Sequence, residues 1–406
     1  MNIAVIASQD LSLYYGSTIR ITGLTKGIAK YGNKIFLLSP NINKELLSAP
    51  SIKWIKTEVD KPLLKGLCSY NYMLFGYNVS KIIRKLLIPN INIREIEDLD
   101  IVHVHSPMLL PLAFEIKYSF NEKVPILLDI HELYSMLSRE LLHIPGIYSV
   151  LKYLNIIYER TIIHDKSEVS SFIVASYPLK SFILKYFKLS QKNVFVVQDG
   201  IDINSIPKFD AEKVNKIRQN LNLNGKIVAT YVGGITFHQG FYDLLEAYKL
   251  AKKYVPRLAL LIIAPRDVYN VLLKSGIDLN DIRVLVNIPR GQLYEYLYAS
   301  DVLVLPHRSN TFHNYVPSLK LIDYMATGKP IVAYSLLSVS FELRNYPLKI
   351  LVTPNEPAEL AKGILDCIKQ YKDAKIEGFL YVKKYDWNEI VKTLLNVYRI
   401  HVYKHL

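Results

Sequence analysis

The sequence has little cysteine and no long hydrophobic run, and each absence excludes a class of protein. Its 406 residues include 2 cysteines, Cys68 and Cys367, which lie far apart. A disulfide framework and a zinc site built on cysteine pairs are therefore excluded, which favours a reducing, intracellular setting. No run of about 18 apolar residues occurs, so no membrane-spanning helix is predicted. The first residues, Met1 to Ala7, lack the layout of a signal peptide, and we expect a cytoplasmic protein.

Positive charge is in excess, but no segment concentrates it. The chain has 50 Lys+Arg and 36 Asp+Glu, a formal net charge of +14. Residues 1–200 carry 23 basic and 17 acidic side chains, and residues 201–406 carry 27 and 19, so the excesses are +6 and +8. There is no basic tail and no zinc-finger or RNA-binding signature. We therefore expect a phosphorylated substrate or an anionic membrane surface as partner, and no nucleic acid.

Apolar residues make up 50% of the chain, enough for sizeable cores, so a disordered chain is excluded. Short apolar runs alternate with helical patterns from end to end. The runs expected to form strands are residues 3–7, 35–38, 101–104, 126–128, 173–175 and 194–197, then 227–232, 258–263, 284–286, 302–305 and 331–333. Because these runs are continuously apolar, they predict parallel sheets covered by helices on both faces, an α/β fold.

The strand and helix pattern restarts near residue 226, which predicts two successive doubly wound domains. We place an N-terminal domain at residues 1–205, a C-terminal domain at 206–385 and a final helical segment at 386–406. Ligands of open α/β sheets bind beyond the carboxyl ends of the strands, so we expect the site in a cleft between the two domains.

Two segments of the N-terminal half carry polar groups at strand ends. Gly16 and Ser17 lie between the first strand and the first helix, where backbone N–H groups can contact a phosphate or a sugar. A plain capped turn is the alternative, because neither the dinucleotide fingerprint nor a Walker loop is present. His103 and His105 share one side of a strand. We expect His105 to contact a ligand and His103 to be a core residue, and we find no carboxylate or third ligand that would complete a zinc site.

A third histidine follows the strand predicted at 126–128. His131 has Asp129 and Glu132 beside it, so acid–base or hydrogen-bonding work is one interpretation. A structural histidine held by Glu132 or a backbone carbonyl is the other. In the C-terminal half, Gly233 and Gly234 form a turn between a strand and a helix, where backbone donors can hold an anion.

A short helix after Pro317 carries the most informative pattern. Ser318 is placed to cap the helix, so N–H groups near Ser318 and Leu319 would face an anion, with Lys320 nearby. Asp323 lies about one turn further, able to accept hydrogen bonds from hydroxyl groups. Alternatively, Lys320 and Asp323 pair with each other at i, i+3 on the helix face.

These segments together resemble the retaining glycosyltransferases of the GT-B fold, glycosyltransferase family 4. The strand from Asp100 to His105 and the segment from Val197 to Asp202 are similar to elements of that family. The run from Ser318 to Pro330 resembles its donor-binding motif, and Tyr385-Asp386-Trp387 with the helix that follows resembles its final element. The resemblance implies two Rossmann-like domains facing a central cleft, with the last helix crossing back to the N-terminal domain.

The resemblance also implies a reaction: transfer of a sugar from a nucleotide-sugar donor to a glycan or polyprenyl-linked acceptor, with retained configuration and without metal or other cofactor. His131 would contact the transferred sugar, and Asp323, in place of the family's glutamate, would bind the donor ribose. Backbone amides of Ser318 and Leu319 would hold the diphosphate. His105 would lie on the acceptor side.

The chain departs from the family at the diphosphate. Gly234 stands where the family usually has arginine, Gln239 where it usually has lysine, and Tyr315 where it has a first motif glutamate. Our hypothesis is that Lys320 and Arg308 supply the missing charge. The alternative is a catalytically impaired subunit or scaffold of the same pathway.

The stretch from Tyr177 to Lys192 combines aromatic and aliphatic residues with lysines and has no acidic residue. Such a face suits docking on anionic lipid, which would make the protein peripheral on the cytoplasmic face of the membrane. The alternative is a solvated basic helix face with no membrane contact.

Overall fold

The computed structural model describes residues 1–13, 16–57, 93–131, 133, 136, 148–164, 168–371, 374 and 376–402. The chain divides into two compact units, unit 1 with Met1–Gly200 and Trp387–Leu406, and unit 2 with Ile201–Asp386. The sequence placed these breaks at 205/206 and 385/386. The observed breaks differ because Ile201 donates its N–H to the carbonyl of Tyr385 at 2.8 Å and forms a β-bridge with Asp386, which ties both chain passages to unit 2.

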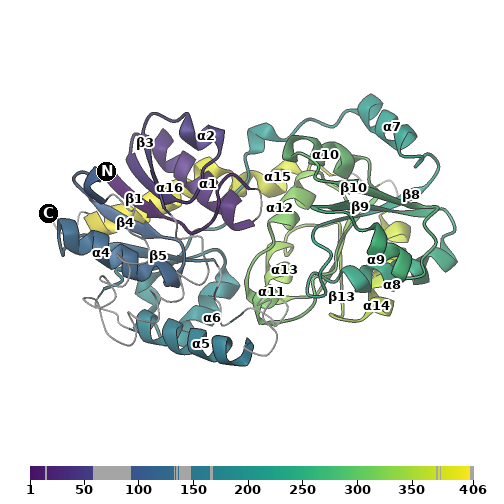
Figure 1. Ribbon diagram of the computed structural model, residues 1–406. Helices are drawn as coiled ribbons and strands as arrows, with labels where there is room; N and C mark the ends of the chain where they lie inside the picture. The colour runs from purple at the N-terminus through teal and green to yellow at the C-terminus, as the bar shows by residue number, and fades with distance from the viewer. Residues whose placement is uncertain are drawn as a thin grey trace. The chain divides into compact units, whose positions relative to one another are not determined.

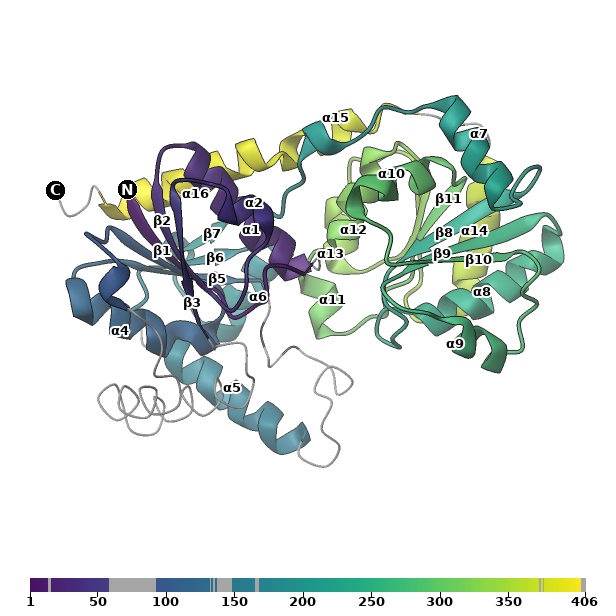
Figure 2. The ribbon, with the colours of Figure 1, turned by 45° about the horizontal axis from the view of Figure 1, so that its top comes forward.

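Unit 1 is built on a parallel sheet with strand order β3-β2-β1-β4-β5-β6-β7. Its strands are β1 (Asn2–Ile6), β2 (Lys34–Ser39), β3 (Ile52–Lys56), β4 (Ile101–Val104), β5 (Ile126–Ile130), β6 (Ser171–Val174) and β7 (Val194–Val196). Its helices are α1 (Gly16–Lys30), α2 (Lys44–Leu47), α4 (Leu110–Phe120), α5 (Tyr148–His164), α6 (Tyr177–Phe187) and α16 (Trp387–Val402). Helices α1 and α16 cover one face of the sheet, and α4 and α5 cover the other (Figures 1 and 2).

Unit 2 repeats the design with a parallel sheet of order β10-β9-β8-β11-β12-β13. Its strands are β8 (Ile227–Val232), β9 (Leu258–Ala264), β10 (Ile282–Val286), β11 (Val302–Leu305), β12 (Ile331–Tyr334) and β13 (Lys349–Val352). Its helices are α7 (Ala211–Asn220), α8 (Phe241–Tyr254), α9 (Tyr269–Lys274), α10 (Arg290–Tyr298), α11 (Thr311–Tyr315), α12 (Leu319–Ala326), α13 (Leu337–Glu342), α14 (Pro357–Gln370) and α15 (Phe379–Val382). Helices α8, α9 and α14 lie on one face, and α10 and α12 lie on the other (Figure 2).

The predicted fold class, two doubly wound parallel α/β sheets, is confirmed. Every predicted strand is present, because continuous apolar runs such as those of β4 and β9 are buried on both faces, as parallel sheets require. Helix α16 packs on α1 within unit 1 (Figure 1), where glycines of α1 admit its side chains. A Cβ built on Gly23 would lie 2.1 Å from Trp387, and one on Gly27 would lie 2.3 Å from Val391.

Each sheet reverses its strand order at one point, and ligands of such sheets bind beyond the strand ends there. In unit 1 the reversal lies between β1 and β4, and His105 follows β4 directly. In unit 2 it lies between β8 and β11, with Gly233 after the first strand and His307 after the second. Within the described ranges, no helix combines the length and the apolar character that a bilayer span requires.

Candidate functional site

In the turn after β8, the backbone at Gly233 lies close to the side chain of Lys320. Gly233 has a φ of +152°, a conformation that favours glycine. A Cβ at this position would lie 2.4 Å from Lys320 Nζ and 2.9 Å from the Tyr231 hydroxyl oxygen. Glycine is therefore required here for the lysine ammonium to lie against the main chain.

Several donors converge on one neutral oxygen beside this turn. Gln239 Oε1 accepts a hydrogen bond from the Gly234 N–H at 3.0 Å and from Lys320 Nζ at 2.8 Å. The Tyr231 hydroxyl points to the same oxygen at 3.4 Å and to the Gly234 carbonyl at 2.6 Å. An ammonium and a backbone N–H aimed at one point are the donors that hold a phosphate oxygen in other proteins.

Helix α12 begins at the same place. Ser318 precedes the helix in extended conformation, and its side chain makes no capping hydrogen bond, contrary to the predicted cap. The N–H groups of the first turn therefore have no side-chain acceptor from this residue, and the positive end of the helix dipole faces outward from Leu319. Ser318, Leu319 and Lys320 are all half-buried, so an anion can reach them.

Lys320 lacks the acidic partner that the sequence offered as an alternative. Within the described ranges, no carboxylate forms an ion pair with it; Asp323 instead pairs with Arg290 of α10. Burial lowers the pKa of the Lys320 ammonium to about 7. Because Lys320 is half-buried and donates to the neutral side-chain amide of Gln239, its ammonium group can bind an anionic ligand.

Histidines line the other side of Lys320. His307 Nε2 lies 3.3 Å from Lys320 Nζ, and the His307 and His313 rings lie 4.3 Å apart between centroids. Burial lowers the pKa of His313 to about 3, with His238 and Lys320 adding to the effect. Burial, then His313 and Lys320, hold the pKa of His307 well below its usual value. Both imidazoles are therefore neutral at neutral pH.

Arg308 lies near this turn but its charge is balanced. Its Nη1 lies 2.5 Å from Asp243 Oδ1, and the guanidinium stacks 4.2 Å from the Phe237 ring centroid. Asp243 also accepts a hydrogen bond from the Tyr334 hydroxyl at 2.9 Å. The pair leaves Arg308 with less positive charge to offer a ligand than Lys320.

Both carboxylate oxygens of Asp323 already accept hydrogen bonds from neighbouring side chains. Its Oδ1 accepts hydrogen bonds from Arg290 at 2.6 Å and from the Tyr294 hydroxyl at 2.7 Å, and its Oδ2 accepts from Arg290 at 3.2 Å. The side chain is buried, whereas Arg290 is partly exposed. A diol that binds Asp323 must therefore share the carboxylate with these two residues.

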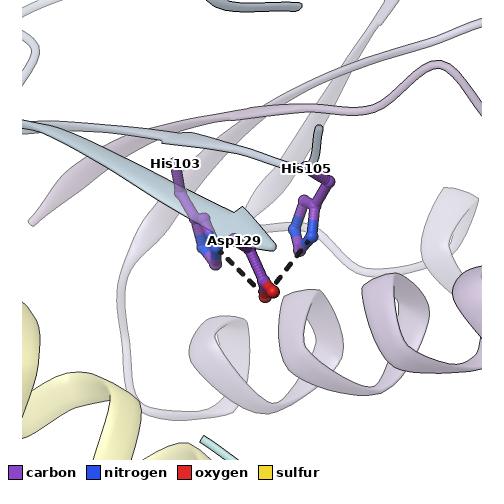
Figure 3. A group of neighbouring side chains, drawn as sticks. All are labelled: His103, His105 and Asp129. Atoms are coloured by element: carbon purple, nitrogen blue, oxygen red, sulfur yellow. Dashed lines mark ion pairs between the residues drawn. The ribbon is translucent and has the colours of Figure 1, made fainter. Parts of the chain in front are cut away.

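Unit 1 carries a second polar cluster at the ends of β4 and β5. His103 Nε2 and His105 Nδ1 each lie 3.5 Å from Asp129 Oδ2, and all three side chains are buried. Figure 3 shows the two imidazoles converging on the carboxylate. The expectation that no carboxylate lies beside the paired histidines is therefore wrong. His103 is a core residue, as predicted, and its Nδ1 lies 2.6 Å from the Tyr398 hydroxyl of α16.

A buried arginine binds the same carboxylate. Arg20 of α1 donates to both oxygens of Asp129, the shortest approach being 2.9 Å, and its Nη1 lies 2.9 Å from Asp199 Oδ1. Burial alone would raise the pKa of Asp129, but Arg20 and the three neighbouring histidines together hold it well below its usual value. Burial raises the pKa of Asp199 although Arg20 opposes the shift. The Arg20 guanidinium therefore pairs with both buried carboxylates of this cluster.

The spacing of this cluster is wide enough for a cation, since one ligand atom from each of His103, His105 and Asp129 lies within 4.8 Å of the others. The guanidinium of Arg20 already occupies both carboxylate oxygens, however. A divalent ion would have to displace or face that positive charge in a dry interior, which is electrostatically unfavourable. The residues therefore do not fit a metal centre well.

His131 follows β5 and belongs to the same network. Its Nδ1 lies 3.7 Å from Asp129 Oδ1, and its ring centroid lies 5.9 Å from that of His105. Glu132, its predicted neighbour, lies outside the described residues. Among the described residues, Asp129 is the carboxylate that forms an ion pair with the candidate catalytic histidine.

Comparison with known families identifies the chain. Residues 14–205 match Glycosyltransferase Family 4, and residues 213–395 match Glycosyl transferases group 1. An uncharacterised glycosyltransferase of Methanocaldococcus jannaschii is 22% identical over 404 residues, covering 95% of this chain and 94% of that protein. This chain belongs to glycosyltransferase family 4.

Solved structures share the GT-B architecture of the glycosyltransferase. Sucrose-phosphate synthase from Thermosynechococcus elongatus superposes with a TM-score of 0.74 at 16% identity, covering 100% of both chains. HepE of Anabaena, crystallised with UDP, superposes with a TM-score of 0.68 at 15% identity, covering 98% of this chain and 99% of that chain. At these identities the likeness is one of fold.

The predicted donor residues of the glycosyltransferase belong to both units. Gly233, Gly234 and Lys320 lie together at the turn after β8. Gly16, the exposed first residue of α1, and the half-buried Ser17 belong to unit 1, and Tyr15 beside them lies outside the described residues.

Sequence reasoning missed the partners that this glycosyltransferase gives its candidate residues. Arg20, Arg290 and the histidines His307 and His313 were not singled out for these roles. One signal was available for Arg20, which is the only charged residue between positions 16 and 25, inside an otherwise uncharged helical stretch. No spacing rule links Arg290 to Asp323, which lies 33 residues away.

Proposed function

We propose that this glycosyltransferase moves a sugar, a hexose in our working hypothesis, from a nucleotide-sugar donor to a glycan or polyprenyl-linked acceptor with retained anomeric configuration. The observation that carries the proposal is the convergence of the Gly234 N–H and of Lys320 Nζ, from the first turn of α12, on one oxygen of unit 2. HepE of Anabaena, a structural neighbour, has been crystallised with UDP and with UDP-glucose, which supports a donor of this class.

The proposed mechanism needs no protein base. The donor diphosphate leaves with growing negative charge, which fixed N–H dipoles at Gly234 and Leu319 and the charge of Lys320 stabilise. An oxygen of the leaving diphosphate takes the proton of the acceptor hydroxyl while that hydroxyl attacks the anomeric carbon on the same face. The bond to the diphosphate breaks, the new glycosidic bond forms, and atoms and charge balance without metal or other cofactor.

The remaining roles follow the family resemblance. His131 contacts the transferred sugar, with Asp129 beside its ring, and Asp323 binds the donor ribose together with Arg290. His105 lies on the acceptor side. Burial, then the neighbouring His103, holds the pKa of His105 well below its usual value, so it acts as a neutral hydrogen-bonding group.

Product formation with a panel of UDP-, GDP- and ADP-sugars and polyprenyl-phosphate or glycan acceptors tests this function. Lys320→Ala should lower turnover about a hundredfold, as loss of one preorganised donor to a developing anion does. Arg308→Gln, the matched variant, should lower turnover less than about tenfold, because Asp243 already balances Arg308. Equal turnover of wild type and Lys320→Ala would refute the role of Lys320, and anomeric inversion in the product would refute retention.

The second candidate is a catalytically impaired subunit or scaffold of the same pathway. Gly234 and Gln239 favour it, because they replace the arginine and lysine that the family usually presents to the diphosphate. Calorimetry with the same donor panel separates the candidates. An active enzyme binds at least one nucleotide-sugar, whereas absence of binding to every donor would favour the scaffold.

We also propose that α6 and the turn after it dock on anionic lipid. Leu179, Ile183 and Phe187 point into unit 1, while Lys185, Lys188 and Lys192 are exposed, so the basic face is free to meet a membrane surface. Sedimentation with vesicles of anionic phospholipid should capture the protein at low salt and release it at high salt. No capture at low salt would refute docking.

A further inference from the structure

Basic side chains meet near the carboxyl ends of β8 and β11. Lys320 Nζ lies 3.3 Å from His307 Nε2. The centroids of the His307 and His313 rings lie 4.3 Å apart, and His238 stacks on His313 with centroids 5.6 Å apart. His307 and His313 are 5% and 6% exposed. Of the ion pairs within the described residues, none joins Lys320, His307 or His313 to a carboxylate. We name these three residues the base cluster.

Two carboxylates on described elements near the base cluster are already paired. Asp243 of α8 is paired with Arg308, and Asp323 of α12 is paired with Arg290. The ring of Tyr231 faces the Lys320 ammonium at 5.7 Å, and burial raises the pKa of its hydroxyl well above the usual value, so it stays neutral. An anionic ligand would therefore be the counter-charge of the Lys320 ammonium at this place.

In the free protein at neutral pH, the two histidines of the base cluster are neutral and Lys320 is only partly protonated. Burial lowers the pKa of Lys320 to about 7, and the pKa of His313 lies at about 3. The buried Nε2 of His313 has no hydrogen-bond partner among the described residues, which is costly for a polar group unless a ligand or water meets it. An anion next to these bases reverses the effect of burial, because it favours their charged forms.

We propose that Lys320, His307 and His313 together are the diphosphate-binding cation of this enzyme, and that they take up a proton as the donor binds. The inference rests on the proposed function and deepens it. The base cluster takes the place of the lysine that the family usually has at Gln239. Lys320, whose pKa lies near 7, takes most of that proton, with the neutral His307 beside it.

Calorimetry on the full chain tests proton uptake directly. UDP, GDP and ADP are titrated at pH 7.5 in two buffers of different ionisation enthalpy. The nucleotide that binds should draw in roughly half to one proton, because a group with a pKa near 7 is mostly neutral at this pH. Between pH 7 and 8.5, above the phosphate pKa of about 6, Kd should rise with pH by up to about tenfold per unit.

Two variants separate the base cluster from a permanent cation. Lys320→Arg cannot lose its proton, so it should still bind the nucleotide while proton uptake falls toward zero and Kd becomes independent of pH. His307→Gln should raise Kd about tenfold and lower the proton number. His401→Gln, a histidine of α16 that bonds Ser171, is the matched control and should behave as wild type.

The outcomes distinguish this inference from the proposed function. Binding with no proton uptake, a flat Kd between pH 7 and 8.5 and an unchanged His307→Gln variant would overturn the base cluster and leave the transferase intact. Failure of wild type to bind any of the three nucleotides would overturn both. Circular dichroism of each variant verifies folding, and the wild-type proton number stands whether or not a variant folds.

Discussion

Replacement of Arg20 by methionine should destabilise unit 1 strongly. Arg20 is 1% exposed and forms ion pairs with both Asp129 and Asp199. Removal of one member of a buried ion pair leaves an uncompensated charge and costs about 3–5 kcal/mol. Methionine retains most of the apolar stem, so lost charge dominates over lost volume.

Urea unfolding followed by tryptophan fluorescence measures this effect selectively. The chain has 2 tryptophans, Trp54 and Trp387, and both belong to unit 1. With a denaturant slope of about 2–3 kcal/mol per molar, the midpoint should fall by roughly 1–2 M. Lys26→Met on the same helix is the matched control. Its partner Glu45 is 58% exposed, so its midpoint should shift by less than about 0.3 M.

The pH dependence gives a second readout of the same charge. In the wild type the depressed pKa of Asp129 stabilises the fold above the unfolded value near 3.8, and this contribution is lost as pH falls through the folded value. Without Arg20, burial raises the pKa of Asp129, and protonation at low pH removes its uncompensated negative charge. The difference between wild type and variant should therefore be largest near pH 7 and shrink below about pH 5. Equal midpoints for Arg20→Met and Lys26→Met at pH 7 would refute the reasoning.

Two further substitutions test packing and hydrogen bonding. Gly240→Ala should cost unit 2 at least about 2 kcal/mol by thermal circular dichroism, because its φ is +72° and a Cβ would lie 1.7 Å from the Pro306 carbonyl oxygen. Gly291→Ala, with nothing within 4 Å, should not destabilise. Tyr398→Phe removes the hydroxyl that bonds the buried His103 and should lower the free energy of unfolding in urea by about 1–3 kcal/mol.

The fold was largely predictable from the sequence, and the strands that were missed share a physical reason. β3 and β13 are the outer strands of their sheets. β3 alternates buried Ile52 and Ile55 with exposed lysines, and β13 is half-buried throughout, so neither forms the continuous buried run that identifies a central parallel strand. Solvent reaches one side of an edge strand, so its residues are less completely buried than those of a central strand.

The candidate site was less predictable, because its chemistry depends on residues far apart in the chain. The local pattern around Ser318 predicts an anion site at the start of a helix, and the family resemblance predicts that the anion is the donor diphosphate. Whether a charged side chain there is available depends on its partner, however. Lys320 has none of opposite charge among the described residues, whereas Arg308 is paired with Asp243, 65 positions earlier. A sequence shows that cations are present, but only the fold shows which of them are already neutralised.

At the contact between α1 and α16, helix propensity and side-chain packing have opposite effects on the stability of a glycine-to-alanine variant. The larger of the two decides whether the variant is stabilised or destabilised. Alanine exceeds glycine in helix propensity by about 1 kcal/mol, so Gly23→Ala would stabilise α1 in isolation. In the folded chain its Cβ would lie 2.1 Å from Trp387, and relief of such a clash costs about 1–3 kcal/mol.

We expect the packing effect to prevail, so Gly23→Ala should destabilise unit 1 in urea unfolding by a net amount of up to about 2 kcal/mol. It should also raise the acrylamide quenching of Trp387. Trp387→Ala creates room for the new methyl group, so in that background Gly23→Ala should become neutral or stabilising, with Trp54 reporting unfolding. A stabilised single variant would mean that α16 does not pack closely on α1 at this glycine. A sign reversal between the two backgrounds would show that the small residues of α1 are there to admit the last helix of the chain.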